Sequence, residues 1–473
     1  MFKKILANTV IYSVAPYIAS FANLLILPLI TKELTEVDYG ISGTIMAYTS
    51  ALSALSVLGI SVVLNNSFFH HKHHYKFVWR QMYGFLIIWN LIYSFILGVF
   101  LYSFMPLAAA ENTIIIIFLN VLPIAFFGPT NFLGTTYYIL EQKSLPIGIR
   151  TAIFGILAVI LNLLFIVHYK FGYMAWFYTN FIIGILTNVS YWFVLNKKIG
   201  ITPIFNFKYR TIKESLKISL PLVPHQYSYY LLNGSERLMM DQVKIDISKI
   251  GEFNIASSFS NYASNLAQAG STAIAPVLMN LYKMQKFRQA RDIVFIYQFV
   301  LLFVNLFVCL WMKEVFFILI HNDVLRKTYD IAIILIMSVS FTPLFVGYFN
   351  LLLFKEKTKN IWIITLIAGI ICVILNLIFL PIYGVTSAAI IIFIAYMYRG
   401  IAGYYLSSFK QVSTISYYPL MWTLIIIIST IAIFLLKDLS LTNKLILTFF
   451  GFIFFLITYS KREALKQKIR NNF

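Results

Sequence analysis

Long apolar runs alternate with short polar breaks along the whole chain. A helix needs about 20 apolar residues to cross the hydrocarbon core of a bilayer, and fourteen runs approach that length when they are divided at charged residues, Gly and Pro. The pattern predicts an all-α integral membrane protein with about 14 transmembrane helices. The predicted spans are Asn8–Ile30, Gly40–Leu64, Met82–Met105, Thr113–Tyr138, Pro146–His168, Tyr173–Leu195, Ile218–Met240, Gly251–Met279, Asp292–Met312, Asp330–Leu353, Ile361–Leu380, Val385–Tyr405, Pro419–Leu436 and Asn443–Tyr459.

The fourth of these spans contains two prolines, Pro123 and Pro129. A proline inside a helix removes a backbone hydrogen bond and clashes with the preceding turn. We therefore expect a kinked helix at this position.

Composition agrees with a membrane protein. The chain is 60% hydrophobic and 11% charged, whereas soluble domains carry about a quarter charged residues. Although the net charge is +20, the basic residues stand in short runs between apolar segments, so we expect no nucleic-acid partner. Lys and Arg gather in alternate loops, and such loops are cytoplasmic. We therefore expect a multi-pass protein of the bacterial cytoplasmic (inner) membrane with both termini in the cytoplasm.

An internal repeat relates the two halves of the chain. Val159-Ile160-Leu161-Asn162-Leu163 recurs 214 residues later as Val373-Ile374-Leu375-Asn376-Leu377, and Gly172 matches Gly384 after a two-residue slip. An even number of spans separates the copies, so the repeat is parallel. This predicts two parallel six-helix lobes around a central cavity plus two C-terminal helices. The expected division is residues 1–195 (helices 1–6), 196–217 (basic cytoplasmic linker), 218–407 (helices 7–12) and 408–473 (helices 13–14 and a basic cytoplasmic tail).

Several short motifs stand in a recognisable order. They are Leu27-Pro28-Leu29-Ile30-Thr31-Lys32-Glu33-Leu34, Tyr39-Gly40, Leu58-Gly59, Ser219-Leu220-Pro221-Leu222-Val223-Pro224, Ser235-Glu236-Arg237, and Leu380-Pro381-Ile382-Tyr383-Gly384 followed by Ala388-Ala389. Their order and spacing resemble the polysaccharide-exporter family of oligosaccharide flippases, in the superfamily that also holds multidrug extruders and peptidoglycan-precursor flippases. Lys32 stands where that family more often has Arg, and Glu236 where it more often has Asp; both keep the charge.

The resemblance implies a flippase that moves undecaprenyl-pyrophosphate-linked oligosaccharide units from the inner to the outer leaflet by alternating access, for O-antigen or capsule synthesis. It implies as partners the polyprenyl-pyrophosphate-linked oligosaccharide, membrane lipids, a polysaccharide polymerase complex and an H+ or Na+ counter-ion. No cofactor is expected.

Polar residues recur on one face of the eighth span. Their intervals of three and four place them on one side of a helix. Such a face suits the hydroxyls of a sugar, although Ser and Asn also join helices to one another inside membranes. Both interpretations stay open. The residues are Asn254, Ser258, Asn261, Asn265, Gln268 and Thr272.

The seventh span has a similar stripe, formed by Gln226, Tyr230, Asn233 and Arg237. An intramembrane arginine is costly and is a functional candidate, here for the pyrophosphate. Lys32 is a further candidate for substrate binding. Two alternatives remain: Arg237 reaches the outer interface, or it pairs with Glu236 or Asp241. The same two carboxylates are the candidates for ion coupling.

Cysteine and histidine indicate no metal site. Cys309 and Cys372 lie far apart in apolar spans, where we expect them to fill the core. Four histidines stand together in a basic inside loop, which we interpret as solvated because adjacent pairs do not specify tetrahedral ligation. They are His70, His71, His73 and His74.

Two other functions compete with the flippase hypothesis. An ion-coupled multidrug extruder of the same superfamily would favour acidic groups in the cavity. A membrane polysaccharide polymerase would need a sizeable outside loop with catalytic groups, and the longest one, Lys313–Tyr329, is short and has none. We therefore expect a transporter and not an enzyme.

Overall fold

The computed structural model describes residues 20–70, 74–357, 361–413, 415–451 and 453. Within these residues the regular structure is helical, and no strand occurs. Ten helices or bent helix pairs in the same ranges are long and apolar enough to span a membrane. The prediction of an all-α membrane protein is confirmed.

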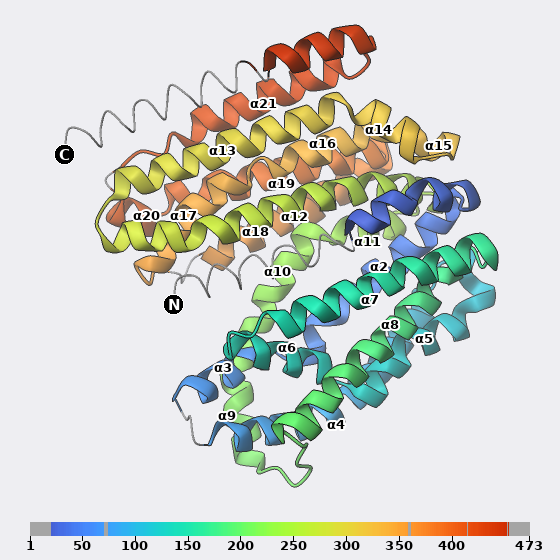
Figure 1. The fold of residues 1–473 in the computed structure, drawn as a ribbon, viewed down its shortest axis with the longest axis vertical. Coiled ribbons are helices and arrows are strands. Elements are labelled where there is room, and N and C mark those ends of the chain that lie inside the picture. Colours follow the sequence, from blue (N-terminus) through green and yellow to red (C-terminus); the bar gives the residue numbers. More distant parts are fainter. Residues whose placement is uncertain (1–19, 71–73, 358–360, 414, 452, 454–473) are drawn as a thin grey trace. The chain divides into compact units, whose positions relative to one another are not determined.

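The helices follow the predicted spans closely (Figure 1). Those of the N-terminal half are residues 20–33, α2 (Glu36–Val57), α3 (Ser61–His70), α4 (Tyr75–Ser103), α5 (Thr113–Phe127), α6 (Thr130–Leu140), α7 (Leu145–Leu163) and α8 (Met174–Phe193). Those of the C-terminal half are α9 (Tyr209–Ser219), α10 (Val223–Asn233), α11 (Ser235–Gln242), α12 (Ile247–Lys283), α13 (Phe287–Leu310), α14 (Met312–Leu319), α15 (Asp323–Arg326), α16 (Tyr329–Val339), α17 (Thr342–Phe354), α18 (Ile361–Tyr383), α19 (Val385–Tyr405), α20 (Ser407–Val412), α21 (Pro419–Leu436) and residues 441–451.

Four of the fourteen predicted spans are not among these ten. The first and the last lie partly outside the described residues. The seventh is divided into α10 and α11 at Gly234. The eighth corresponds to α12, which is 37 residues long but carries the polar stripe, and this lowers its mean hydropathy.

Helix breaks fall at definite residues. The predicted kink of the fourth span is confirmed, because α5 ends at Phe127 and α6 begins at Thr130, with Gly128 at φ 47° between them. Three further spans are also broken, which the apolar pattern did not reveal. Their breaks lie at Leu58–Ile60, Gly234 and Ser340–Phe341.

At two of these breaks, backbone groups that lack a partner within their helix form hydrogen bonds to side chains of other helices. At the start of α6, Asn188 Oδ1 accepts from Thr130 Oγ1 at 3.1 Å and from the Asn131 amide at 3.2 Å. At the break between α16 and α17, Gln298 Nε2 donates to the Ser340 carbonyl at 2.8 Å. Such bonds are required in lipid, where no water can replace them.

The two copies of the predicted repeat have matching turns, of a type that also occurs at Lys244 and Gln285. Gln142 and Glu356, 214 positions apart, both have left-handed backbones, at φ 54° and φ 57°. The next residue in each copy donates its amide to the carbonyl five residues back, Lys143 to Tyr138 and Lys357 to Leu352, both at 2.9 Å. The matched glycines Gly172 and Gly384 also share a positive φ, 55° and 66°.

The chain divides into two compact units. Unit 1 comprises Met1–Ser258, Leu319–Thr328 and Thr358–Ala395; unit 2 comprises Phe259–Ile318, Tyr329–Lys357 and Tyr396–Phe473. In unit 1, α5 packs against α4 and α8, while α10 and α11 pack against α18 (Figure 1). In unit 2, α13, α16 and α21 pack against one another. The predicted lobes, residues 1–195 and 218–407, stay a prediction.

Candidate substrate site

Arg237 on α11 is the centre of a polar cluster in unit 1. Its Nε donates to Asn254 Oδ1 at 3.0 Å, its Nη1 to Glu236 Oε1 at 3.2 Å, and its Nη2 to Ser257 Oγ. The guanidinium also lies 5.7 Å from the ring centre of Phe253. Its side chain is 15% exposed. Of the two alternatives to a substrate role, pairing with Glu236 is therefore present in this structure.

Glu236 is more deeply buried than its partner. The residue is 2% exposed, and among the described residues its Oε2 has no hydrogen-bond partner. Glu236 lies on α11, which packs against α18 and α2. A buried carboxylate is tolerated when an opposite charge is paired with it, and Arg237 supplies that charge.

Asp241, the other candidate for ion coupling, lies one turn further along α11. Its Oδ2 accepts a hydrogen bond from Tyr48 Oη of α2. Gln242 Nε2 donates to the same phenol at 3.2 Å. These contacts join the start of the C-terminal half to α2, so Asp241 belongs to a helix contact as well as to the candidate site.

The stripe predicted on the seventh span is interrupted. Gln226, Tyr230 and Asn233 lie on α10, which ends at Asn233, whereas Arg237 lies on the separate helix α11. The helical spacing that placed all four on one face therefore holds for three of them. Tyr230 Oη donates to the Ala47 carbonyl at 3.0 Å, which links α10 to α2.

The stripe on α12 lies on one continuous helix, as predicted. Within unit 1, Ser258 donates to the Asn254 carbonyl of its own helix at 3.0 Å. Within unit 2 the remaining side chains are exposed, in contrast to neighbours such as Ala267. These exposed residues are Asn261, Asn265, Gln268 and Thr272.

Lys32 is not brought to this cluster. It is exposed near the end of the helix at residues 20–33, and none of the contacts described for Arg237 involves it. The neighbouring Thr31 is buried and donates to the Leu319 carbonyl at 3.4 Å. A substrate role for Lys32 stays a prediction.

Sequence reasoning missed a close contact between α2 and α12. A Cβ on Gly40 would lie 1.9 Å from the Ile247 carbonyl oxygen, and a Cβ on Gly251 would lie 1.7 Å from the Glu36 carbonyl oxygen. Glycines let helix backbones touch in this way. We call this contact of Glu36–Gly43 with Ile247–Asn254 the α2–α12 seal. Its signals in the sequence were Gly40 and Gly43 on α2 and Gly251 on α12.

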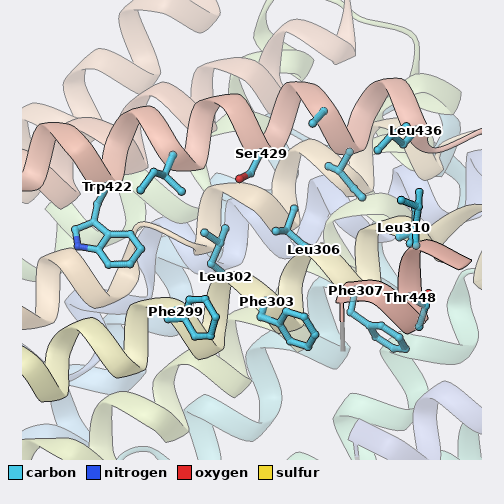
Figure 2. A pocket seen from close by; sticks show the side chains of 15 residues that line it. Phe299, Leu302, Phe303, Leu306, Phe307, Leu310, Trp422, Ser429, Leu436 and Thr448 are labelled. Carbon is cyan, nitrogen blue, oxygen red and sulfur yellow. The ribbon is translucent and has the colours of Figure 1, made fainter. Parts of the chain in front are cut away.

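Unit 2 has an apolar groove of about 520 Å³ between α13, α21 and the helix at residues 441–451. Figure 2 shows phenylalanine and leucine side chains from α13 facing Trp422 and Leu436 of α21. Ser429 and Thr448 are its polar lining residues.

No group of three or more His, Cys, Asp or Glu side chains suited to a metal ion occurs in the described part of the chain. His70 and His74 are exposed, and His71 and His73 lie outside the described residues. Cys309 and Cys372 are free and buried, as their apolar surroundings predicted.

Known proteins share the family and the fold. Residues 5–282 match the family model described as polysaccharide biosynthesis protein. No curated protein is significantly similar in sequence. Among solved structures, a lipid II flippase MurJ in an inward closed conformation is 13% identical, with 92% of this chain and 98% of that chain covered and a TM-score of 0.62. A MATE family transporter of the MOP superfamily in an inward-facing conformation is 16% identical, with 88% and 95% covered and a TM-score of 0.59.

At such low identity these structures establish the fold alone. That fold, with the ten candidate membrane spans, defines a multi-pass membrane protein whose fold is shared by known flippases and transporters. The chain belongs to the polysaccharide biosynthesis protein family.

Proposed function

We propose that this chain flips a polyprenyl-pyrophosphate-linked oligosaccharide from the inner to the outer leaflet of the bacterial cytoplasmic membrane. The cargo is an undecaprenyl-pyrophosphate repeat unit for a surface polysaccharide such as O-antigen or capsule. Two lobes alternate in exposing the cargo site. Family membership and the shared fold of a lipid II flippase support this assignment.

The observation that carries the proposal is the partly buried guanidinium of Arg237, held by three acceptors and still 15% exposed. A guanidinium binds two phosphate oxygens at once through its planar fork. The cation thus suits the pyrophosphate end of the cargo. Lys32 is kept as a second phosphate contact on the resemblance alone.

The sugar end requires donors and acceptors without a fixed charge. The exposed amides of α12 meet this requirement, and in our proposal they bind the oligosaccharide together with the polar residues of α10. The proposed sugar contacts are Asn254, Ser258, Asn261, Asn265 and Gln268 on α12, and Gln226, Tyr230 and Asn233 on α10.

An H+ or Na+ counter-ion is also part of the proposal. Glu236 suits this role better than Asp241, because one of its oxygens has no hydrogen-bond partner in the described part of the chain, whereas Asp241 is bonded by Tyr48. A carboxylate that loses Arg237 to the cargo must regain a positive partner or a proton.

Deletion of the gene tests the proposal. Cells without the protein should accumulate lipid-linked repeat units on the inner leaflet, and plasmid-borne protein should reverse this. If the units reach the outer leaflet and stay unpolymerised, the polymerase hypothesis is favoured. If polysaccharide is normal and the cells become sensitive to cationic drugs, the multidrug extruder hypothesis is favoured.

A further inference from the structure

We infer that Asn254 is a positioning residue that couples the occupancy of Arg237 to the α2–α12 seal, so that an anion bound to Arg237 releases the seal. The inference rests on the proposed function, in which the anion is the pyrophosphate of the cargo. On the predicted topology, the seal lies at the outer face of the membrane.

Asn254 makes one hydrogen bond to Arg237 and one to the α2 backbone. Its Oδ1 accepts from Arg237 Nε at 3.0 Å, and its Nδ2 donates to the Tyr39 carbonyl on α2 at 3.0 Å. Arg237 is only a donor and the carbonyl is only an acceptor. The amide therefore has one productive orientation, and Arg237 is the group that fixes it.

The seal offers the amide little freedom to find other partners. A Cβ on Gly43 would lie 2.7 Å from Asn254 Cγ, so the carboxamide rests directly on the α2 backbone. One turn away, Gly40 and Gly251 bring the two backbones together. Van der Waals contacts have little directional preference, whereas the bond from Asn254 to the Tyr39 carbonyl fixes the relative position of the two backbones at this point.

An anion and the seal compete for the same guanidinium. In the sealed state all three nitrogens of Arg237 already have acceptors, in Asn254, Glu236 and Ser257. A phosphate that takes the edge of the fork containing Nε displaces Asn254 Oδ1. The amide then loses the partner that orients it toward Tyr39, and the seal weakens. Two states that differ in their contacts to one ligand are shifted by that ligand.

A cysteine behind the seal reports its opening. Ala47 lies one turn beyond Gly43 on α2 and is 6% exposed, so Ala47→Cys is a small change. The natural cysteines, Cys309 and Cys372, are both 0% exposed and should not react. The probe is a membrane-impermeant maleimide added outside intact cells, and total cysteine is measured with a permeant maleimide in detergent.

The cargo is varied genetically. One strain makes the lipid-linked unit, and the other cannot transfer the first sugar phosphate to polyprenyl phosphate. With Asn254 intact, Ala47→Cys should label about fivefold faster in the strain that makes cargo, a typical size for coupling between two sites. With Asn254→Ala, labelling should be fast in both strains.

Two further variants sharpen the test. Asn254→Asp keeps the size and the acceptor for Arg237 but loses the donor to Tyr39, so it should also label fast in both strains. Asn120→Ala is the matched control, because Asn120 Nδ2 donates only to the Ile116 carbonyl of its own helix among the described contacts, at 2.8 Å. This variant should keep the fivefold response.

The outcomes separate this inference from the proposed function. If deletion stops flipping but cargo leaves the labelling unchanged, or if Asn254→Ala and Asn254→Asp keep the fivefold response, Asn254 does not couple the two sites and the proposed function stands. If deletion leaves both polysaccharide and lipid-linked units normal, the proposed function itself fails, and the inference fails with it.

Discussion

Glu236 and Arg237 are adjacent in the chain and form an ion pair, with Arg237 Nη1 3.2 Å from Glu236 Oε1. The carboxylate is almost fully buried, and the guanidinium is its only hydrogen-bond partner among the described residues. Removing one partner of a buried pair leaves an uncompensated charge, at a cost of about 3–5 kcal/mol. Any experiment on Arg237 must therefore separate transport from stability.

Arg237→Ala should abolish surface polysaccharide and also lower the melting temperature in detergent, because Glu236 loses its counter-charge. The double variant Glu236→Gln/Arg237→Ala should regain most of the melting temperature and still make no polysaccharide. Arg237→Lys should keep part of the transport, because lysine has the charge but not the planar fork.

Surface polysaccharide at matched membrane expression is the measurement for these variants. If Arg237 only anchors the helix at the membrane interface, Arg237→Lys should make normal amounts of polysaccharide and Arg237→Gln should be tolerated. Near-normal polysaccharide in the double variant would remove Arg237 from the site and leave the α12 stripe as the principal candidate.

The exposed amides of α12 give a second prediction. If they bind sugar, Asn261→Leu and Gln268→Leu should each lower the rate of flipping about 2- to 10-fold, the value of one lost hydrogen bond of about 0.5–1.5 kcal/mol. Their melting temperatures should be unchanged. If the amides join helices, stability falls instead. Asn120→Leu, on α5, is the control for adding a leucine in a span.

The sequence predicted the fold well where one signal dominates. Apolar runs locate the spans because a bilayer demands that length of hydrocarbon contact. Two prolines predicted a bend in the fourth span; Pro129 lies at the break before α6, whereas Pro123 lies inside the continuous helix α5. The repeat around Asn162 and Asn376 is matched by equal turns at Gln142 and Glu356.

The site was less predictable because its contacts depend on tertiary packing. The regular spacing from Gln226 to Arg237 continues across Gly234, where α10 ends. A single glycine in a sequence is not enough to predict that a helix ends there. The partner Ser257 comes from α12 and becomes visible only when α11 packs beside it. Lys32 was predicted to bind substrate because of its charge and its place in a motif. Neither property indicates how far Lys32 lies from Arg237.

Topology is the third prediction, and it rests on the alternation of Lys- and Arg-rich loops. Reporter enzymes fused after Asn196 and at the C-terminus should both indicate cytoplasm. A reporter in the loop at residues 313–329 should indicate the outside and serves as the control. An external signal at Asn196 would overturn the fourteen-span arrangement and also the outer placement of the α2–α12 seal.

The last prediction concerns Lys444, on the helix at residues 441–451. Its side chain is 0% exposed, and its Nζ donates to both oxygens of Glu314 at 2.8 Å. Glu314→Gln leaves a buried ammonium with no counter-charge, so we expect a loss of about 3–5 kcal/mol in the free energy of unfolding. The double variant Glu314→Leu/Lys444→Met should lose much less, because it removes both charges.

An exposed pair supplies the control for Lys444. Arg210 and Glu214 are 90% and 63% exposed, and exposed pairs contribute little, so Glu214→Gln should leave the melting temperature nearly unchanged. The measurement is the melting temperature in detergent of the unchanged protein and of the three variants Glu314→Gln, Glu314→Leu/Lys444→Met and Glu214→Gln. Equal melting temperatures for Glu314→Gln and Glu214→Gln would show that the Lys444 pair does not hold the C-terminal helix in unit 2. A loss confined to Glu314→Gln would show that it does, because both variants replace a paired Glu by Gln and only the Glu314 pair has a buried partner.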